Sequence, residues 1–223
     1  MLSSKQGMTV DEYMDTYRYG RTDPYDIDSW RNPDLTKLNI GCGEKILKGW
    51  VNVDFMAGPE VIAHDIMSFP WPFDDDRFDY LLAMHILEHI PQYVYPFPGD
   101  ILNGVLDEMF RVMKDGGTIE IHVPHPRNPW TLCHMGHTRL VGLRTFQGLL
   151  NGDDTASSEI AYLVRKYRLE LLDYKVWYNV NIGKITDYHF RKYLGRIGGH
   201  ITRFLGHPEV SRMVFRLRKN GGK

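Results

Sequence analysis

Short apolar runs separated by turn residues divide much of the chain into alternating strands and helices. Patterns typical of buried strands occur at residues 37–41, 50–54, 61–65, 78–84 and 118–123. Residues 101–114 carry apolar side chains at helical spacing, and Asp115-Gly116-Gly117 is expected to end that helix. Two prolines are expected to make residues 69–73 irregular. The alternation predicts an α/β fold with a parallel sheet and helices on both faces.

The flanking segments predict additions to this sheet. Residues 1–36 are polar and aromatic, and Thr9 with Glu12 has the spacing of a helix-capping box. We expect these residues to form an N-terminal extension that packs across the domain. Towards the other end, the pattern predicts a helix at 157–172 that runs into a strand at 171–178, a basic helical segment at 184–205 and a terminal strand at 212–218.

Charge is spread unevenly, although the formal net charge is only −1. Residues 1–100 hold 8 Lys and Arg against 17 Asp and Glu, whereas residues 179–223 hold 10 against 2. A basic tail on an acidic body favours contact with a nucleic acid, a membrane surface or an acidic ligand; equally, it can be a solvated helical face that pairs with the acidic half.

Cysteine usage and hydropathy predict the compartment. The two cysteines, Cys42 and Cys133, make no disulfide framework and suit a reducing environment. The first residues hold no apolar run of signal-peptide length, and no stretch approaches the roughly 20 apolar residues of a membrane span. We therefore expect a cytoplasmic protein.

Glycines and acids follow the predicted strands where a parallel sheet binds ligands. Gly41-Cys42-Gly43 follows the first strand, and open parallel sheets bind ligands at the carboxyl ends of their strands. Glycines let a ligand lie close to the backbone, whose N–H groups can bind an anionic group. Asp54 ends the second strand, where it can accept from both ribose hydroxyls. Asp65 follows the third strand and can accept from an adenine amino group, beside the Ile66 backbone. Together these residues predict a nucleoside site.

The same segments carry a family resemblance. Asn39-Ile40-Gly41-Cys42-Gly43, Val51-Asn52-Val53-Asp54, His64-Asp65-Ile66, the fourth strand with its Leu87-Glu88-His89 ending, and residues 106–117 resemble, in order, the motifs of class I S-adenosylmethionine-dependent methyltransferases. Gly49-Trp50, Pro124-His125 and Gly136-His137-Thr138-Arg139 resemble a compact, methyltransferase type 11-like branch from bacteria and bacteriophages.

The resemblance implies a fold, a cofactor and a set of contacts. The fold is a Rossmann-like, doubly wound, mostly parallel seven-stranded sheet with an antiparallel last strand. The cofactor is S-adenosyl-L-methionine. A bacteriophage origin would place the protein in the host cytoplasm. The implied cofactor-binding residues are Asn39, Gly41, Cys42, Gly43, Asp54, Phe55, Asp65, Ile66, Met84 and His85.

The exit from the glycine loop is unusually short. Only Glu44 to Gly49 precede the second strand, too few for a multi-turn helix at about 3.6 residues per turn. A dinucleotide site needs Gly-x-Gly-x-x-Gly followed by a helix, so NAD and FAD are disfavoured. We expect the 1–36 extension to cover the site in place of that helix, and Cys42 to pack rather than react.

Histidines near the predicted site are the candidates for acid–base chemistry. His85, His125 and His137 are candidate catalytic bases or substrate contacts, although each can also serve structure alone. Glu88 and His89 are expected on the turn that follows the fourth strand, where Glu88 is expected to cap or fix the loop. The acceptor-site loop region is expected at residues 124–156, with substrate contacts from Arg127, Trp130 and Arg139.

A metal site is not expected from the local histidine cluster. Its members are His122, His125, Cys133, His134 and His137. His134 and His137 have a ligand spacing if they lie on a helix, but zinc sites need three or four converging ligands.

One domain is therefore predicted, at residues 37–223, with a basic helical insertion at 179–208. Its expected function is methyl transfer to an oxygen or nitrogen acceptor on a small molecule or glycan. Three alternatives stay open: a nucleic acid or nucleotide acceptor bound by the basic C-terminal region, a non-catalytic cofactor-binding assembly protein, and a non-methyl use of the sulfonium. The chain lacks the Asp/Asn-Pro-Pro-Tyr/Phe motif of amino methylases and the Pro-Cys nucleophile of cytosine methylases, so ordinary DNA base methylation is not supported.

Overall fold

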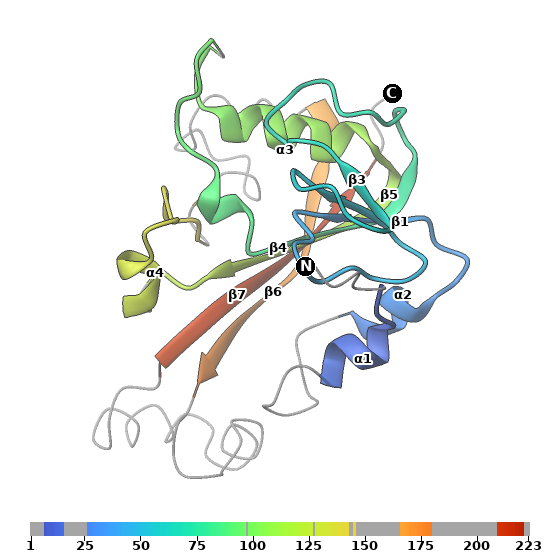
Figure 1. Ribbon diagram of the computed structural model, residues 1–223, viewed down its shortest axis with the longest axis horizontal. Coiled ribbons are helices and arrows are strands. Elements are labelled where there is room, and N and C mark those ends of the chain that lie inside the picture. Colours follow the sequence, from blue (N-terminus) through green and yellow to red (C-terminus); the bar gives the residue numbers. More distant parts are fainter. Residues whose placement is uncertain are drawn as a thin grey trace.

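A seven-stranded sheet in the order β3-β2-β1-β4-β5-β7-β6 is the centre of the protein (Figure 1). The computed structural model describes residues 7–15, 26–96, 98–126, 128–142, 145, 166–179 and 209–220. The strands are β1 (Lys37–Ile40), β2 (Val51–Asp54), β3 (Val61–Ala63), β4 (Phe78–Met84), β5 (Met113–Pro124), β6 (Leu169–Asn179) and β7 (Glu209–Lys219). Strands β1 to β5 pair in parallel, and β7 runs antiparallel to both of its neighbours. The predicted fold class, with its antiparallel last strand, is confirmed.

The two faces of the sheet bury different clusters. Leu81 and Ala83 of β4 pack in the larger cluster with helix α3 (Ile101–Arg111). Tyr80 and Leu82, on the opposite face, pack with Trp30. That face is covered by α1 (Val10–Asp15) and α2 (Ile27–Arg31), on the other side of the sheet from α3 (Figure 1). The alternation of β4 therefore buries both faces, as a doubly wound sheet requires.

Several predicted boundaries move by a few residues, and one prediction is wrong. The helix ends at Arg111, and Asp115-Gly116-Gly117 lies inside β5 rather than ending the helix. The reason is sheet pairing: Arg77 and Phe78 donate backbone hydrogen bonds to the Val112 carbonyl, which draws the chain into the sheet immediately after α3. The second strand begins one residue later than predicted, the third ends at Ala63, and β6 begins at Leu169, inside the predicted helix.

The N-terminal segment joins the fold through backbone and side-chain contacts. The predicted capping box is confirmed: the Thr9 N–H donates to Glu12 Oε2 at 2.6 Å, and the Glu12 N–H donates to Thr9 Oγ1 at 3.2 Å. Met8 forms a parallel bridge with Leu47, on the short exit from the glycine loop. No helix forms at residues 44–49, as the spacing predicts, and Met8 pairs with the chain there instead.

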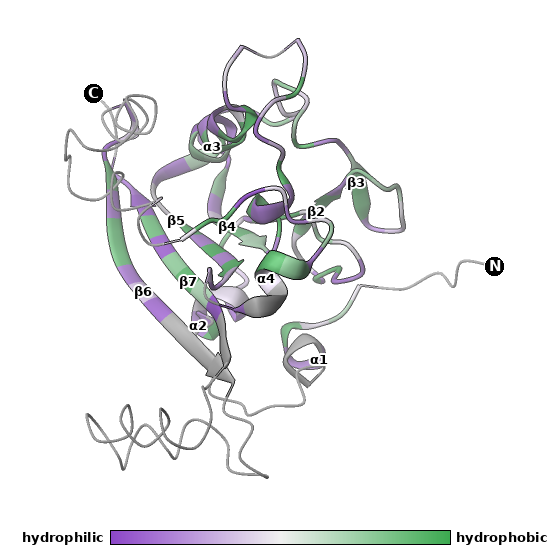
Figure 2. Ribbon diagram, turned by 90° about the vertical axis from the view of Figure 1, so that its left-hand side faces the viewer, coloured by the Kyte–Doolittle hydropathy of each residue, from purple (hydrophilic) through white to green (hydrophobic). Residues whose placement is uncertain are grey.

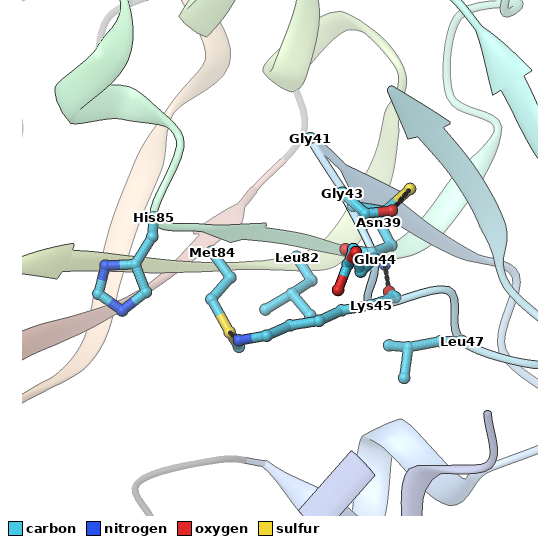
Figure 3. Close-up of a pocket in the computed structure, with 10 residues that line it drawn as sticks. Asn39, Gly41, Gly43, Glu44, Lys45, Leu47, Leu82, Met84 and His85 are labelled. Carbon is cyan, nitrogen blue, oxygen red and sulfur yellow. Dashed lines mark hydrogen bonds between the residues drawn. The ribbon is translucent and has the colours of Figure 1, made fainter. Parts of the chain in front are cut away.

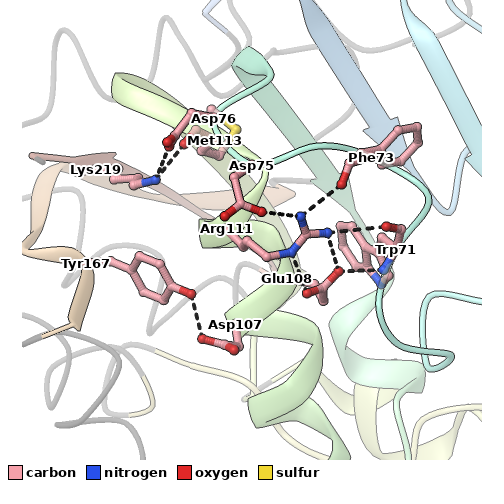
Figure 4. Close-up of polar contacts among 10 residues, drawn as sticks. All are labelled: Trp71, Phe73, Asp75, Asp76, Asp107, Glu108, Arg111, Met113, Tyr167 and Lys219. Atoms are coloured by element: carbon pink, nitrogen blue, oxygen red, sulfur yellow. Dashed lines mark hydrogen bonds and ion pairs between the residues drawn. The ribbon is translucent and has the colours of Figure 1, made fainter. Parts of the chain in front are cut away.

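The irregular stretch between β3 and β4 is held against α3 by one arginine (Figure 4). The Arg111 guanidinium pairs with Glu108 at 2.7 Å and with Asp75 at 2.6 Å. It also donates to the Trp71 and Phe73 carbonyls. Two prolines leave this segment without regular hydrogen bonding, so the guanidinium supplies the contacts that fix it.

A polar network is sealed inside the sheet between β4, β5 and β7. Glu120 is fully buried and accepts from Tyr80 Oη at 2.6 Å, Arg216 Nε at 2.8 Å and His122 Nε2 at 2.6 Å. Complete burial lowers the pKa of His122 to about 4 against the pull of Glu120, so its ring is neutral near pH 7. Burial alone would raise the pKa of Glu120. The hydrogen bonds and charges of His122 and Arg216 have the larger effect and lower this pKa to about 2.

Several basic residues of the C-terminal region lie on strand β7 and are buried in the fold. Along β7, hydrophobic and hydrophilic residues alternate in bands (Figure 2), and Arg212, Arg216 and Lys219 are all buried. Lys219 pairs with Asp76, and Arg216 with Asp173 at 2.9 Å. Lys219 and Arg216 therefore pair with acidic side chains of the fold. Residues 157–165 of the helix predicted at 157–172, the helix predicted at 184–205 and most of the 179–208 insertion lie outside the described residues. None of the helices in the described ranges is long and apolar enough to cross a membrane.

Candidate active site

The glycine loop follows β1 at the point where the strand order reverses, since β1 has β2 on one side and β4 on the other. Gly41 and Gly43 adopt φ of +58° and +51°, a region that side chains with a Cβ rarely enter. A Cβ at Gly41 would lie 2.4 Å from Ile86 Cδ1, so the loop and the segment after β4 approach closely only with glycine there. The loop therefore needs these two residues for its shape.

Cys42 packs between the two glycines. Its side chain is buried, and its N–H donates to the Val53 carbonyl at 3.1 Å. Burial, with the nearby Asp54 carboxylate, raises the pKa of the thiol to about 12. The thiol therefore stays protonated near neutral pH, which suits packing and not nucleophilic attack.

Asp54 links the glycine loop to the end of β2. Its Oδ2 accepts from the Gly43 N–H at 2.8 Å and its Oδ1 from the Met56 N–H at 3.1 Å. Each carboxylate oxygen keeps a second lone pair for a ligand hydroxyl. The Asp54 carbonyl accepts from the His64 N–H, which places the exposed Asp65 at the same edge of the sheet. Phe55, the next residue along from Asp54, is 73% exposed.

A cavity of about 330 Å³ opens beside this loop (Figure 3). Its volume is at the lower end of the range for small-molecule sites, about 300–1,000 Å³. Its lining residues are Asn39, Gly41, Cys42, Gly43, Glu44, Lys45, Leu47, Leu82, Met84 and His85. Six of them were predicted from the sequence, whereas Asp54, Phe55, Asp65 and Ile66 lie at the neighbouring strand ends and do not line it.

Sequence reasoning missed four lining residues. Glu44 and Lys45 follow the glycine loop directly, and that adjacency is the signal that could have identified them. Lys45 extends past Leu82, and its Nζ lies 4.0 Å from Met84 Sδ (Figure 3). Leu47 and Leu82 line the cavity because of the tertiary fold, and no local sequence signal identifies them.

His85 lies at the mouth of this cavity, immediately after β4. Its N–H donates to the His122 carbonyl at 2.9 Å, and its φ of +54° is a strained conformation of the kind found at functional sites. Its Nδ1 lies 3.2 Å from Oε1 of Glu88, whose side chain is 1% exposed, whereas the imidazole is 36% exposed. A carboxylate only accepts, so Nδ1 carries the hydrogen and Nε2 keeps a lone pair. Glu88 Oε2 has no hydrogen-bond partner among the described residues.

Comparison with known proteins agrees with this geometry. Residues 45–121 match the sequence model of a family described as a methyltransferase domain. A S-adenosylmethionine-dependent methyltransferase from Archaeoglobus fulgidus has the same fold, with a TM-score of 0.50 and 17% identity, over 82% of this chain and 86% of its own. The middle of the chain is therefore similar to a methyltransferase domain, and its fold is that of an S-adenosylmethionine-dependent methyltransferase.

A second such methyltransferase, from Methanosarcina mazei, is 17% identical with a TM-score of 0.47, over 90% of this chain and all of its own. No curated protein sequence matches the chain. Both of these structures are described as S-adenosylmethionine-dependent methyltransferases.

The groups at the cavity fit S-adenosyl-L-methionine. The cofactor carries an amino acid end with both charges, a ribose and an adenine. Glu44 and Lys45 offer one charge of each sign beside the glycine loop, Asp54 offers free lone pairs, and Asp65 lies beyond it. The open space at Gly43, where an added Cβ would meet nothing within 4 Å, leaves room for a ligand at the backbone.

The predicted acceptor residues are spread along one loop region. His125 follows β5, and its carbonyl accepts from the Asn128 N–H and Thr131 Oγ1. Trp130 lies in α4 (Pro129–Cys133), and Arg127 is outside the described residues.

Arg139 is a structural tether in this arrangement. Its guanidinium pairs with both oxygens of Asp100, at 2.8 and 2.9 Å, and donates to the Ile90 and Pro91 carbonyls. These bonds use most of its donors, so its side chain holds the loop against the segment after β4.

The histidine cluster differs from the grouping that the sequence suggests. His122 is buried in the sheet with Glu120, away from His134 and His137. His134 and His137 lie on a turn after α4, not on a helix, and His89 joins them from the segment after β4. The sequence places His89 on a turn and does not group it with these histidines.

Proposed function

We propose that this methyltransferase transfers the methyl group of S-adenosyl-L-methionine to an oxygen or nitrogen atom of a small molecule or glycan, with His85 as the general base. The observation that carries the proposal is the His85–Glu88 pair at the mouth of the cavity, with Nδ1 held by a buried carboxylate and Nε2 presented outward.

The residues around the cavity would hold the cofactor by its distinct parts. Gly41, Gly43 and the neighbouring Glu44 and Lys45 would contact the amino acid end, which carries both charges. Asp54 would accept from the ribose hydroxyls with its free lone pairs, with Phe55 beside it. Asp65 and the Ile66 backbone would meet the adenine. When bound, the cofactor supplies an electrophilic methyl group on its sulfonium.

His85 would remove the acceptor proton as the new bond to carbon forms. The acceptor O–H or N–H donates to His85 Nε2, and the proton moves to that nitrogen. Glu88, 3.2 Å from Nδ1, keeps the ring in the required tautomer and stabilises the positive charge that it gains. Alignment of the acceptor with the methyl group supplies a large further part of the rate.

The described part of the N-terminal extension, residues 7–15 and 26–36, would close the cofactor side of the site. Met8 exchanges backbone hydrogen bonds with Ile46 and Lys48, at 2.7 and 2.8 Å, directly after the glycine loop. The loop region at 124–156, with His125 and His137, would receive the acceptor on the other side.

Burial of three basic residues on β7 favours a small acceptor over a nucleic acid. Arg212, Arg216 and Lys219 are buried, so they offer no surface to a phosphate backbone. Nucleic-acid binding depends on such accessible charges, which would then have to come from the 179–208 insertion.

Labelled methyl transfer tests the proposal. The purified chain is incubated with trideuteromethyl-labelled cofactor and with metabolite, glycan and nucleic-acid fractions in turn, and products are followed by mass spectrometry. We expect the label on an oxygen or nitrogen of a small molecule or glycan, and much less of it with Asp54→Ala when the cofactor is limiting. Label on nucleic acid alone would replace the proposed acceptor class. No label in any fraction, with cofactor binding intact, would favour a non-catalytic assembly role.

A further inference from the structure

Three histidines converge beside the candidate active site although they come from two distant segments. His89 ends the short helix η1 (Leu87–His89), and His134 and His137 lie on the turn after α4. One ligand atom from each lies within 4.8 Å of the other two. The His134 and His137 rings stack at 4.3 Å, and His89 meets the His137 ring edge-on at 4.9 Å. We propose that these three side chains bind one divalent transition-metal ion of the Zn²⁺ class.

Backbone carbonyls already orient two of the rings for this role. His89 Nδ1 donates to the Gly136 carbonyl, and His137 Nδ1 donates to the Thr131 carbonyl, each at 2.9 Å. A carbonyl only accepts, so each Nδ1 carries the hydrogen and each Nε2 keeps its lone pair. Metal-binding histidines are typically held in this way, with the second nitrogen bonded to a carbonyl or carboxylate.

His134 is the ligand that must adjust. Its Nδ1 accepts from the Gly136 N–H at 3.1 Å, and its side chain is exposed. It can exchange that bond for a metal bond by a small rotation of the turn. Three nitrogens at about 2.0–2.1 Å from one ion lie roughly 3.3 Å apart, so the rings must close by less than about 2 Å.

Gly136 makes the approach of the rings possible. A Cβ at this position would lie 3.1 Å from His89 Nδ1 and 3.2 Å from His134 Cε1, closer than most such contacts. A larger residue would therefore push the rings apart.

The ligand set indicates the class of metal. Three neutral imidazoles with no carboxylate or thiolate in the group suit Zn²⁺, Co²⁺ or Ni²⁺ rather than Mg²⁺ or Ca²⁺. Three protein ligands leave a fourth position for water or for an oxygen of a bound molecule.

The site adjoins the segment that carries the candidate base. The Thr138 N–H donates to the Glu88 carbonyl at 2.9 Å, and Thr138 Oγ1 donates to the Ile90 carbonyl at 2.8 Å. A bound ion would therefore fasten the loop after α4 to the segment after β4. This inference does not depend on the proposed methyl transfer.

Metal titration of the untagged chain tests the site, because a histidine tag would itself bind the ion. After treatment with a chelator, Zn²⁺ is titrated by calorimetry and Co²⁺ by visible absorption. We expect one equivalent of Zn²⁺ and Co²⁺ bands typical of nitrogen and oxygen ligands. His89→Ala and His137→Ala should each weaken Zn²⁺ binding by more than about tenfold. His64→Ala removes a histidine that directly follows β3, outside the cluster, and should leave Zn²⁺ binding unchanged.

The outcomes separate the proposal from simple ring packing. Wild-type protein that binds no stoichiometric Zn²⁺, or variants that bind as well as wild type, would overturn it. If His137→Ala fails to fold, His134→Ala replaces it, since that side chain is exposed and its loss should weaken Zn²⁺ without changing thermal stability in the metal-free state. Cofactor titration on the same samples shows separately whether the methyltransferase site is intact.

Discussion

Two histidine–glutamate pairs lie close together along β4 and β5, and they differ in burial. His122 and Glu120 are both fully buried, with Tyr80 and Arg216 closing the network around them. His85 and Glu88 make a similar pair at the mouth of the cavity, but only the carboxylate is buried. The backbone joins the pairs, since the His85 N–H donates to the His122 carbonyl.

The difference shows what a local pair can and cannot do. Complete burial keeps His122 neutral and places it beyond the reach of a ligand, so its pair contributes to stability. His85 keeps one nitrogen open to a bound molecule, so its pair can move a proton. Changes to the sealed pair should therefore affect folding, and changes to the open pair should affect catalysis.

Removal of the open imidazole should have the largest effect. We expect His85→Ala to lower kcat by about 100- to 10,000-fold, since general-base catalysis typically contributes that much. The free energy of unfolding should change little, because the ring is partly exposed. Steady-state kinetics and chemical denaturation measure the two quantities. Wild-type kcat in this variant would remove His85 from the mechanism.

Removal of Arg216, the cation beside the sealed pair, should lower stability and not act first on catalysis. Arg216→Met leaves the buried Glu120 carboxylate without its cation, which we expect to cost about 3–5 kcal/mol of unfolding free energy. The exposed Arg218 on the same strand provides the control, and Arg218→Met should change stability by less than about 0.5 kcal/mol. Equal urea midpoints for the two variants would show that the sealed network contributes no stability.

Loss of the acid at the end of β2 should weaken cofactor binding by a smaller factor. Asp54→Ala removes hydrogen bonds to a charged acceptor, which we expect to raise the Kd for the cofactor by roughly 10- to 100-fold. The exposed Asp74 is the control residue, and Asp74→Ala should bind as wild type does. Calorimetry gives both values, and unchanged affinity in Asp54→Ala would overturn the ribose assignment.

Acid should weaken the sealed pair before it affects the rest of the fold. The pKa of His122 is lowered from 6.5 to about 4 in the folded state, so the unfolded chain binds the proton more tightly. The associated stability is present above pH 6.5 and is lost as the pH falls towards 4, by roughly 1 kcal/mol at pH 5.5. Urea denaturation across this range should show the loss, and His122→Leu should remove it. A His122 ring that NMR shows to titrate near pH 6.5 would contradict the account.

The cofactor side of the site follows from the sequence more fully than the acceptor side does. Gly41, Gly43 and Asp54 lie within 14 residues of chain, and each lies at or near the end of a strand that hydrophobic patterning identifies. Parallel pairing then brings the strand ends to one edge, so position along the chain predicts position in space. The short exit loop and the capping box at Thr9 are predictable for the same reason, because both are local.

The acceptor side depends on contacts between distant segments. His89 lies beside His134 and His137, although at least 45 residues of sequence separate it from them. Spacing along the chain instead grouped His134 and His137 with His122, which is buried in the sheet. Arg139 is predicted as a substrate contact from its place in the acceptor-site loop, and its pairing with Asp100, in another segment, is not visible in the sequence. Leu47 and Leu82 line the cavity only because Met8 and β4 place them there. Tertiary packing decided each of these positions.

Cofactor binding by the untagged chain is the most direct test of the account. S-adenosylhomocysteine, the demethylated product, is titrated into the purified protein by calorimetry, and S-adenosyl-L-methionine is then used to compete with it. The account predicts one saturable site per chain, with competition between the two ligands and weaker binding in Asp54→Ala. Correctly folded wild-type protein that binds neither ligand would contradict it.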